Sequence, residues 1–467
     1  MNYEGPAKDE FAALVDELAL PAEPQGSLYL DGDPPRLASP HRISLAAALA
    51  LLAEGAAIAA LWEQRGGHPQ EIRLNARDAV FELNPLPWLR RNAHVAMTLA
   101  HVGQPCAGYF RTRDQRMFLI VAYSPRLLEG TLRLLGCPND HEAVSRLIAD
   151  RDGEELERAF AGAGLTGALV RSSQEWLHHP EGRLLTHAPV LQIERIGDAP
   201  PMRLSTATRP FGGIRVGDMT HVIAGPIVSR CLAEQGADVL HLGPIHPKLV
   251  DPTGLTIATG MGKRSAIIDF SAGDGPLLSR LLRGADVFVE SWRPGMLEAH
   301  GFGPAQVAAV QPGIIYLSVS CYGSAGSWAR RGGFDPLAQA STGMAEDEAR
   351  CDTYKLSPPG VLTDAIAGFL GAAAIASVLA RRAREGGSWH IKISLARIAM
   401  WIQSLGQYPD GGTPDDMGSP RIWQMESPFG ILDYVAPALR YSETPSHFDT
   451  PPVPVGASPL SWLPASA

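Results

Sequence analysis

The stretch IRVGDMTHVIAGPIVSRCLAEQGADVLHL at residues 214–242 joins two short β-branched runs through a segment of helix length. Three further runs follow: SAIIDF at 265–270, ADVFVE at 285–290 and GIIYLSVS at 313–320. Short apolar strands that alternate with helix-length segments are typical of a parallel sheet with crossover helices. The sequence therefore predicts an α/β fold with a doubly wound parallel-sheet lobe.

The sequence on either side of this region indicates further secondary structure and domain divisions. An Ala-rich helix is expected at 364–384, followed by the short strand HIKIS at 390–394. Upstream, the pattern is mostly helical, with RMFLIVAY at 116–123 as the clearest strand, which indicates a smaller α+β lobe. The expected divisions are an N-terminal arm (1–40), the small-domain-like region (41–205), the Rossmann-like sheet lobe (206–410) and a Pro- and Gly-rich tail (411–467), either extended over other surfaces or partly disordered.

One helix–turn–strand unit occurs twice in the sequence. GAAIAALWEQRGGHPQEIRLNARDA at 55–79 resembles AAAIASVLARRAREGGSWHIKISLARIA at 372–399. The alignment places Ala47 opposite Asp364, so only the second copy has a carboxylate at that position. The alternative interpretation is a chance likeness between two Ala-rich helices.

Composition excludes several classes of protein. The net charge of −9 argues against a general nucleic-acid binder, yet it leaves room for one basic pocket that takes an anionic ligand. The five cysteines are scattered, without a CxxC pair or a histidine cluster, which favours a reduced cytoplasmic protein with no metal site. The N-terminus lacks a secretory pattern, and the apolar run at 43–62 carries Glu54, so we expect no membrane helix.

Two common nucleotide motifs are missing. The turn THVIAGP after the first strand lacks the G-x-G-x-x-G pattern of dinucleotide-binding proteins. GMGKRS at 260–265 is similar to a phosphate loop, but Arg264 replaces the Ser or Thr that would hold magnesium. Neither a nicotinamide oxidoreductase nor an ATPase is predicted.

Six blocks follow one another along the chain: GIRVGDMTHVIAGPIVSRCLAEQGADVL (213–240), GKRSAIIDF (262–270), ADVFVESWRPGMLEAHGFG (285–303), QPGIIYLSVSCYGSAG (311–326), FDPLAQASTG (334–343) and LTDAIAGFLGAAAIASVLARR (362–382). In this order they resemble the family III coenzyme A transferases, a group that also contains the α-methylacyl-CoA racemases. Two segments upstream, at 109–138 and 171–193, resemble the family's small domain and the part that follows it. The domain order is therefore inverted, as in a permutation or a fusion of two partial copies.

The resemblance implies a CoA transferase that takes an acyl-CoA and a carboxylic acid as substrates, binds no permanent cofactor, and forms an interlocked homodimer. In LTDAIAG, Asp364 matches the catalytic aspartate of the family. An aspartate can carry the acyl group and then CoA itself as covalent intermediates. Amide groups at the helix entry would stabilise an oxyanion. Without the surrounding blocks, Asp364 would be interpreted as a helix cap.

The resemblance also implies a set of CoA contacts. Lys263 and its neighbour Arg264 would meet the phosphates, and the VIAGP turn would let the backbone approach the ligand closely. Trp292 would stack on adenine, although core packing is the alternative. The predicted contacts are His221, Ala224, Gly225, Lys263, Arg264, Ser291, Trp292 and Asp335.

Two departures from the family pattern keep other functions open. Phe334 stands where the racemases carry a histidine, so the acid–base pair for racemisation is incomplete and a racemase is the second choice. The family's glycine-rich loop has no counterpart in the expected order unless Gly411–Gly412 serves. A non-catalytic CoA-binding subunit is the third interpretation.

Overall fold

The computed structural model describes residues 6–20, 27–96, 104–243, 253–349 and 353–464. A seven-stranded sheet forms its centre, in the spatial order β11-β10-β9-β12-β13-β14-β8. Every neighbouring pair is parallel except β14 with β8, which confirms the predicted α/β class and the largely parallel sheet. The strands are β11 (Lys263–Ile267), β10 (Asp238–Gly243), β9 (Arg215–Met219), β12 (Val287–Glu290), β13 (Ile315–Ser320), β14 (Ser388–Ser394) and β8 (Leu191–Gly197).

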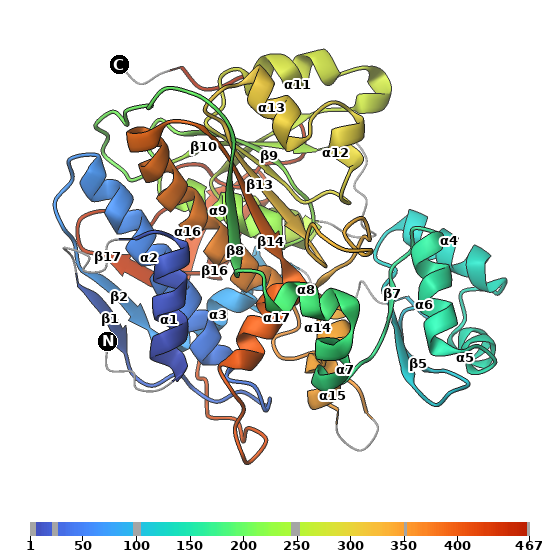
Figure 1. The fold of residues 1–467 in the computed structure, drawn as a ribbon. Coiled ribbons are helices and arrows are strands. Elements are labelled where there is room, and N and C mark those ends of the chain that lie inside the picture. Colours follow the sequence, from blue (N-terminus) through green and yellow to red (C-terminus); the bar gives the residue numbers. More distant parts are fainter. Residues whose placement is uncertain (1–5, 21–26, 97–103, 244–252, 350–352, 465–467) are drawn as a thin grey trace.

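Helices cover both faces of this sheet (Figure 1). Val216 and Ile315 point into a core shared with α9 (Ala224–Glu234) and α16 (Leu362–Glu385). Phe288 belongs to the opposite core, which is covered by α11 (Gly275–Leu282), α12 (Met296–Ala299) and α13 (Pro304–Val310). Burial on both faces explains why the strands are apolar runs without polar alternation.

The strand order determines where a ligand can bind. Strand β9 pairs with β10 on one side and with β12 on the other, so the chain changes direction across the sheet at β9. In open α/β sheets, ligands bind in the crevice at the carboxyl ends of the strands next to such a switch point. The turn after β9, at residues 220–223, lies at this crevice.

Helix α16 is buried between α9 and α2 (Ile43–Gln64). Small residues allow this close packing. A Cβ atom built on Gly368 would lie 2.6 Å from Ile227 Cβ and 3.4 Å from the Ala224 carbonyl oxygen, both in α9. Because Asp364 lies one turn before Gly368 on α16, this contact also sets its distance from the β9–α9 turn.

We expect Gly368→Ala to destabilise the protein, although alanine is the better helix former. The added methyl group must push α16 and α9 apart, which costs about 1–3 kcal/mol, against about 1 kcal/mol gained in helix propensity. A lowered thermal midpoint with reduced activity is the expected result. Gly162→Ala, in a helix where a Cβ meets nothing within 4 Å, is the control and should not lower the midpoint. An unchanged Gly368→Ala midpoint would contradict the packing argument.

The repeated unit has the same architecture in both copies. Helix α2, strand β2 (Ile72–Asn75) and α3 (Ala76–Leu83) match α16, β14 and α17 (Leu395–Ser404) in order. Strands β2 and β14 each pair with one parallel and one antiparallel neighbour, and for β2 these are β1 (Leu28–Asp31) and β17 (Leu439–Tyr441). The two helices pack along each other, and Ala47 of α2 is fully buried.

By length and hydropathy, α2 and α16 would each be able to cross a membrane. Both lie almost wholly inside the protein, where α16 is enclosed by α2 and α9. Their apolar character is therefore accounted for by burial in the core, since a helix that is hydrophobic all round belongs either there or in a bilayer.

A smaller α+β lobe stands beside the main sheet (Figure 1). Its antiparallel sheet, in the order β5-β6-β7, packs on three helices around a separate core that includes Phe118 and Phe160. The three helices confirm the expected helical pattern. The elements are β5 (Gly108–Arg111), β6 (Met117–Ile120), β7 (Gly167–Leu169), α4 (Pro125–Leu135), α5 (His141–Ala149) and α6 (Gly153–Gly162).

The ends of the chain are more structured than the sequence indicates. The expected arm contains α1 (Pro6–Glu17), whose Glu17 carboxylate accepts hydrogen bonds from the Val190 and Leu191 amides. The expected tail contains β17 and a hairpin of β15 (Ile422–Ser427) and β16 (Gly430–Val435). These strands pair with distant strands, which a local pattern does not reveal. The hairpin forms a sheet with β3 (Arg90–Arg91) and β4 (His94–Val95).

The sequence predicts one small-domain-like region at residues 41–205, but parts of this region pack into the large body. Helix α2 is apolar all round and packs on α16, and β8 completes the main sheet, so both belong to the large body and not to the small lobe. The remaining short elements are η1 (Leu86–Trp88), α7 (Ser173–His178), α8 (Pro180–Thr186), α10 (Thr253–Thr259), η3 (Phe270–Ala272), α14 (Asp335–Thr342) and α15 (Met344–Asp347).

Candidate active site

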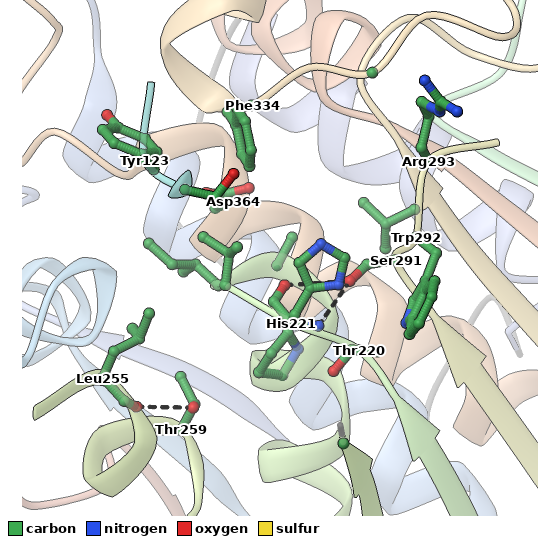
Figure 2. A pocket seen from close by; sticks show the side chains of 18 of the residues that line it. Tyr123, Thr220, His221, Leu255, Thr259, Ser291, Trp292, Arg293, Phe334 and Asp364 are labelled. Carbon is green, nitrogen blue, oxygen red and sulfur yellow. Dashed lines mark hydrogen bonds between the residues drawn. The ribbon is translucent and has the colours of Figure 1, made fainter. Parts of the chain in front are cut away.

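A cavity of about 430 Å³ opens at the carboxyl ends of β9, β10 and β12 (Figure 2). Its wall comes from the β9–α9 turn, the loop after β12, the first turn of α16 and the small lobe. Seven of the nine predicted residues line it, while Gly225 and Asp335 lie behind the wall. The seven are His221, Ala224, Lys263, Arg264, Ser291, Trp292 and Asp364.

Asp364 lies on the first turn of α16 and faces the cavity, next to Phe334 and Tyr123 (Figure 2). The ring centroids of Tyr123 and Phe334 are 5.5 Å apart in an edge-on arrangement. The side chain of Asp364 is 7% exposed. Among the described lining residues, Asp364 is the only one with an acidic side chain. A single carboxyl group therefore stands in a largely apolar chamber.

Asp335 holds the start of α16 from behind. Its Oδ1 accepts hydrogen bonds from the Thr363 amide at 2.6 Å and the Thr363 hydroxyl at 2.5 Å. Gln339 donates to Oδ2 at 2.7 Å, and the Asp364 amide donates to the same carboxylate. Asp335 thus caps α16 and is no CoA contact. The amide groups that were expected to stabilise an oxyanion here are already bonded to Asp335, which corrects that expectation.

The two carboxyl groups are electrostatically linked. Burial raises the pKa of Asp364 well above its ordinary value, and the negative charge of Asp335 raises it further. Burial also raises the pKa of Asp335, but the hydrogen bonds from Thr363, Gln339 and the Asp364 amide oppose that rise. The shared negative charge is therefore held by Asp335, and Asp364 is the member that keeps its proton to higher pH.

Asp335→Asn should move the acid limb of the activity profile to lower pH. A nucleophilic Asp364 must be ionised, so activity rises as pH increases through its raised pKa. Removing the negative charge of Asp335 lowers that pKa, while the amide oxygen of Asn can still accept bonds from Thr363. The pH dependence of kcat for both proteins is the measurement. If the acid limb of the Asp335→Asn profile stays at the same pH or moves to higher pH, the electrostatic coupling between Asp335 and Asp364 is excluded.

The β9–α9 turn is built by close backbone contacts. A Cβ on Gly225 would lie 2.6 Å from Thr220 Cγ2 and 3.1 Å from Ser291 Cβ, so only glycine fits there. The His221 amide donates to Ser291 Oγ at 3.1 Å, and this hydroxyl donates back to the His221 carbonyl oxygen at 3.2 Å. Val222 has φ +72°, an uncommon value for a β-branched residue. Such strained positions concentrate at functional sites.

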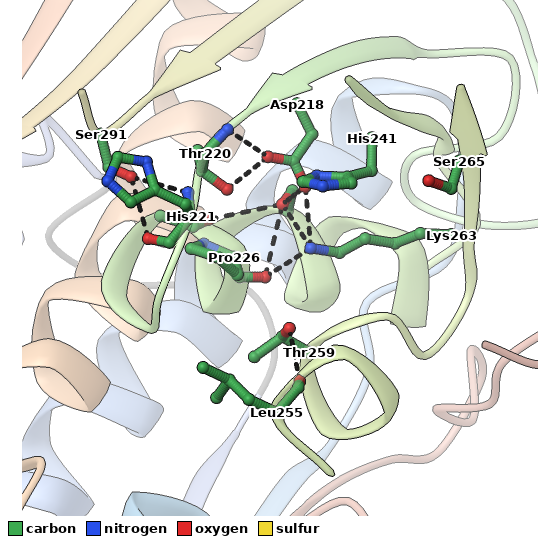
Figure 3. A network of polar contacts seen from close by, with 12 residues as sticks. Asp218, Thr220, His221, Pro226, His241, Leu255, Thr259, Lys263, Ser265 and Ser291 are labelled. Carbon is green, nitrogen blue, oxygen red and sulfur yellow. Dashed lines mark hydrogen bonds and ion pairs between the residues drawn. The ribbon is translucent and has the colours of Figure 1, made fainter. Parts of the chain in front are cut away.

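Lys263 does not present its ammonium group to a ligand as expected. Its Nζ donates to Asp218 Oδ2 at 2.8 Å, the Pro226 carbonyl oxygen at 2.7 Å and Ser229 Oγ at 2.8 Å (Figure 3). An ammonium group has three donors, and all three are used. Burial opposes the charge of Asp218, but Lys263 outweighs it and holds the pKa of this carboxyl well below its usual range. The pair ties β9, β11 and α9 together beneath the cavity.

Arg264 is also engaged by a protein partner. Its Nη2 and Nε lie 2.7 Å and 3.0 Å from Asp238 Oδ1, and its Nη1 donates to the Ser461 carbonyl oxygen at 2.8 Å. The guanidinium group thus joins neighbouring strands to the C-terminal segment. The predicted phosphate contacts of Lys263 and Arg264 are therefore replaced by structural roles.

Lys263→Met should lower stability strongly. It removes the ammonium partner of the buried Asp218 carboxylate, and breaking a buried pair in this way costs about 3–5 kcal/mol. Urea unfolding should therefore show a lower midpoint, and the double variant Lys263→Met/Asp218→Asn should recover part of the loss. If Lys263 were a phosphate ligand, the single variant would instead keep its stability and show a weakened, less salt-dependent affinity for CoA.

Trp292 is half-buried in the cavity wall, and its side chain lies next to Ser291 (Figure 2). Its ring lies edge-on to His221 at 6.1 Å and to Phe270 at 6.3 Å. It also packs against the core beneath α11 and α13. The position is compatible with both expected roles, because one part of the indole is in the core and another lines the cavity.

Several lining residues are absent from the sequence prediction. The small lobe contributes Tyr123, Arg126 and Thr166, and the loop before α14 contributes Gly332–Gly333 next to Phe334. The adjacent glycines and the family block at 334–343 are the available signal for that loop. Gly411–Gly412 do not line the cavity. A Cβ on Gly412 would collide with the backbone of Ser39, so this pair packs near the N-terminal segment.

The fold and the cavity define a class of protein: an α/β protein with a carboxyl group in a ligand site at the switch point of its sheet. Residues 211–420 match the model of CoA-transferase family III. The match covers the main sheet from β9 onward and includes both Asp335 and Asp364.

Curated relatives carry transferase names. An acetyl-coenzyme A transferase of Hypoxylon pulicicidum is 27% identical over 329 residues, which is 64% of this chain and 55% of the relative. The succinate–glutarate CoA-transferase of Agrobacterium fabrum is 27% identical over 230 residues, 45% of this chain and 58% of the relative. The chain spans about half the length of the curated relatives it matches.

A solved structure is also similar. The crystal structure of a CAIB/BAIF family protein from Brucella suis shares 28% identity over 42% of this chain and 55% of that chain, with a TM-score of 0.38. The family assignment therefore rests on the sequence matches.

Proposed function

We propose that the protein transfers CoA from an acyl-CoA donor to a carboxylic acid, with Asp364 as the covalent carrier. The observation that carries this proposal is the placement of Asp364, the only acidic side chain among the described lining residues, in a cavity at the switch point of the sheet. The names of the relatives support the same activity: one is an acetyl-coenzyme A transferase and another transfers CoA between succinate and glutarate.

The proposed reaction proceeds through three covalent intermediates at one carboxyl group. The ionised Asp364 attacks the thioester carbonyl, CoA thiolate leaves, and an aspartyl anhydride forms. The thiolate then attacks the aspartyl carbonyl, which releases the donor acid and leaves an aspartyl-CoA thioester. The acceptor carboxylate displaces CoA to form a second anhydride, and CoA thiolate attacks the acceptor carbonyl and restores Asp364. No oxidant or external base is consumed.

The residues around Asp364 are suited to protecting these intermediates from hydrolysis. Tyr123 and Phe334 place aromatic surface beside the carboxyl group, and Gly332–Gly333 line the same cavity without side chains. The small lobe supplies Tyr123, so this wall comes from the same chain as Asp364. Exclusion of water limits hydrolysis of reactive intermediates.

The racemase alternative is weakened by the same geometry. Phe334, which replaces the histidine of the racemases, lies directly beside Asp364 in the cavity (Figure 2). A phenyl ring cannot remove or return a proton, so the pair of bases that racemisation requires is incomplete at this position. Incorporation of solvent deuterium at the α-carbon of a 2-methylacyl-CoA, without transfer to an acid, would favour the racemase.

Asp364→Asn should abolish transfer while leaving the fold intact, because the amide is a poor nucleophile of the same shape. We expect a loss of at least about 10³-fold in kcat, in line with the removal of a covalent nucleophile. Incubation of the unmodified protein with acyl-CoA should give a borohydride-reducible adduct on the peptide that contains Asp364. Asp198→Asn, at an exposed acid, is the control. Full activity of Asp364→Asn would exclude this mechanism.

Three further expectations stay predictions: the interlocked homodimer, the cytoplasmic location and the inverted domain order. The paired units around α2 and α16 support a fusion of two partial copies, because they share element order and strand neighbours. Only the second copy carries the proposed nucleophile.

A further inference from the structure

Three arginines line one end of the cavity, where the small lobe meets the main sheet. Arg126 lies on the first turn of α4, Arg293 follows β12, and Arg331 precedes Gly332–Gly333. Arg126 and Arg293 are exposed, and neither has an acidic partner among the described residues. The chain as a whole is acidic, with a net charge of −9, so this group is a local excess of positive charge.

Arg126 of the small lobe and Arg293 of the main sheet lobe both approach the same residue, Gly164. Arg126 Nη2 donates to the Gly164 carbonyl oxygen at 3.3 Å. A Cβ on Gly164 would lie 2.8 Å from Arg293 Nη1, and the stem of Arg293 lies along Gly332, with Cδ 3.5 Å from a Cβ built there. Two guanidinium groups at one residue repel each other unless an anion accompanies them. Because Gly164 has no side chain, it does not fill the space between the two guanidinium groups.

Arg331 adds to the positive charge because its nearest carboxylate is already engaged. Arg331 Nη1 lies 4.0 Å from Glu157 Oε2, but Arg171 binds both oxygens of Glu157, at 2.9 Å and 2.7 Å. The guanidinium carbon of Arg331 is held 3.9 Å from the centroid of the Trp328 ring. Because Glu157 already forms a bidentate ion pair with Arg171, its negative charge only weakly neutralises Arg331.

Other arginines nearby are placed differently. Arg264 lines the cavity but is bonded to Asp238, and Arg330 lies outside the cavity lining, 3.9 Å from Glu298. Arg133, on the last turn of α4, is exposed and also outside the lining. Among the arginines that the structure places in the cavity lining, Arg126 and Arg293 are therefore the two without an ion pair to a described carboxylate.

We propose that Arg126 and Arg293 form an anion site that binds a negatively charged group of the ligand in this cavity, with Arg331 as a supporting charge. Naming the ligand as an acyl-CoA rests on the proposed function. The anion is either a phosphate of CoA or a terminal carboxylate of a dicarboxylic acyl group, since guanidinium groups bind both. Because the two arginines belong to different lobes, the bound anion would also tie the small lobe to the sheet above Asp364.

The test compares the double variant Arg126→Met/Arg293→Met with the matched control Arg133→Met/Arg330→Met. Methionine keeps most of the aliphatic stem and removes the charge. Calorimetric titrations use CoA and pantetheine, which lacks the nucleotide phosphates. Turnover is measured with glutaryl-CoA and valeryl-CoA, donors of equal carbon number that differ in one terminal carboxylate.

A phosphate partner predicts that the double variant loses about 10- to 100-fold in affinity for CoA and none for pantetheine. An acyl carboxylate partner predicts unchanged CoA affinity and a similar loss of kcat/KM for glutaryl-CoA but not for valeryl-CoA. The inference is overturned if the double variant matches the control in all four assays. It is also overturned if kcat/KM falls equally for glutaryl-CoA and valeryl-CoA while the affinity for CoA is unchanged.

Failure of the proposed function is distinguishable from failure of the anion site. If the unmodified protein turns over neither donor, the transferase proposal loses its support, and the CoA titration then decides the anion site alone. A loss of CoA affinity in the double variant would support the site without turnover. Unchanged CoA affinity under those conditions would overturn it.

Discussion

The hydrogen bonds between Asp335 and the first turn of α16 are the constraint on which the site depends. They fix the start of a helix that is buried along most of its length and whose far end is held by the Arg382–Asp286 ion pair. Burial raises the pKa of Asp364, and these bonds hold a second negative charge behind it that raises this pKa further. One buried carboxylate thus positions the proposed nucleophile and adds to the rise of its pKa.

Burial of α16 requires close neighbours on two sides. Gly368 admits Ile227 of α9, and α2 covers the opposite side of the helix. The N-terminal copy of the repeated unit therefore serves as packing for the copy that carries Asp364. Because the first copy has Ala47 at the matching position, it has no carboxyl group at the place that corresponds to Asp364.

The base of the cavity depends on a different kind of contact. Asp218 and Lys263 form a buried ion pair in which every ammonium donor is used, and the Thr220 amide and hydroxyl bond to the same carboxylate. This network orients the turn that follows β9. A charged residue in a family motif can therefore be essential to the shape of a binding site without touching the ligand.

The sequence by itself determined the strands of the main sheet except β8, the small lobe's helices, the paired helix–strand units and the position of Asp364 in the family pattern. Those features depend on local periodicity and on ordered motifs, which a single chain displays directly. Tertiary structure alone decided which basic side chains already form ion pairs within the protein. Lys263 pairs with Asp218 and Arg264 with Asp238, whereas Arg126 and Arg293 meet at Gly164. It also decided that β17 pairs with β2 and that β16 pairs with β3. Such outcomes depend on contacts between residues hundreds of positions apart, and residue type and spacing carry no record of them.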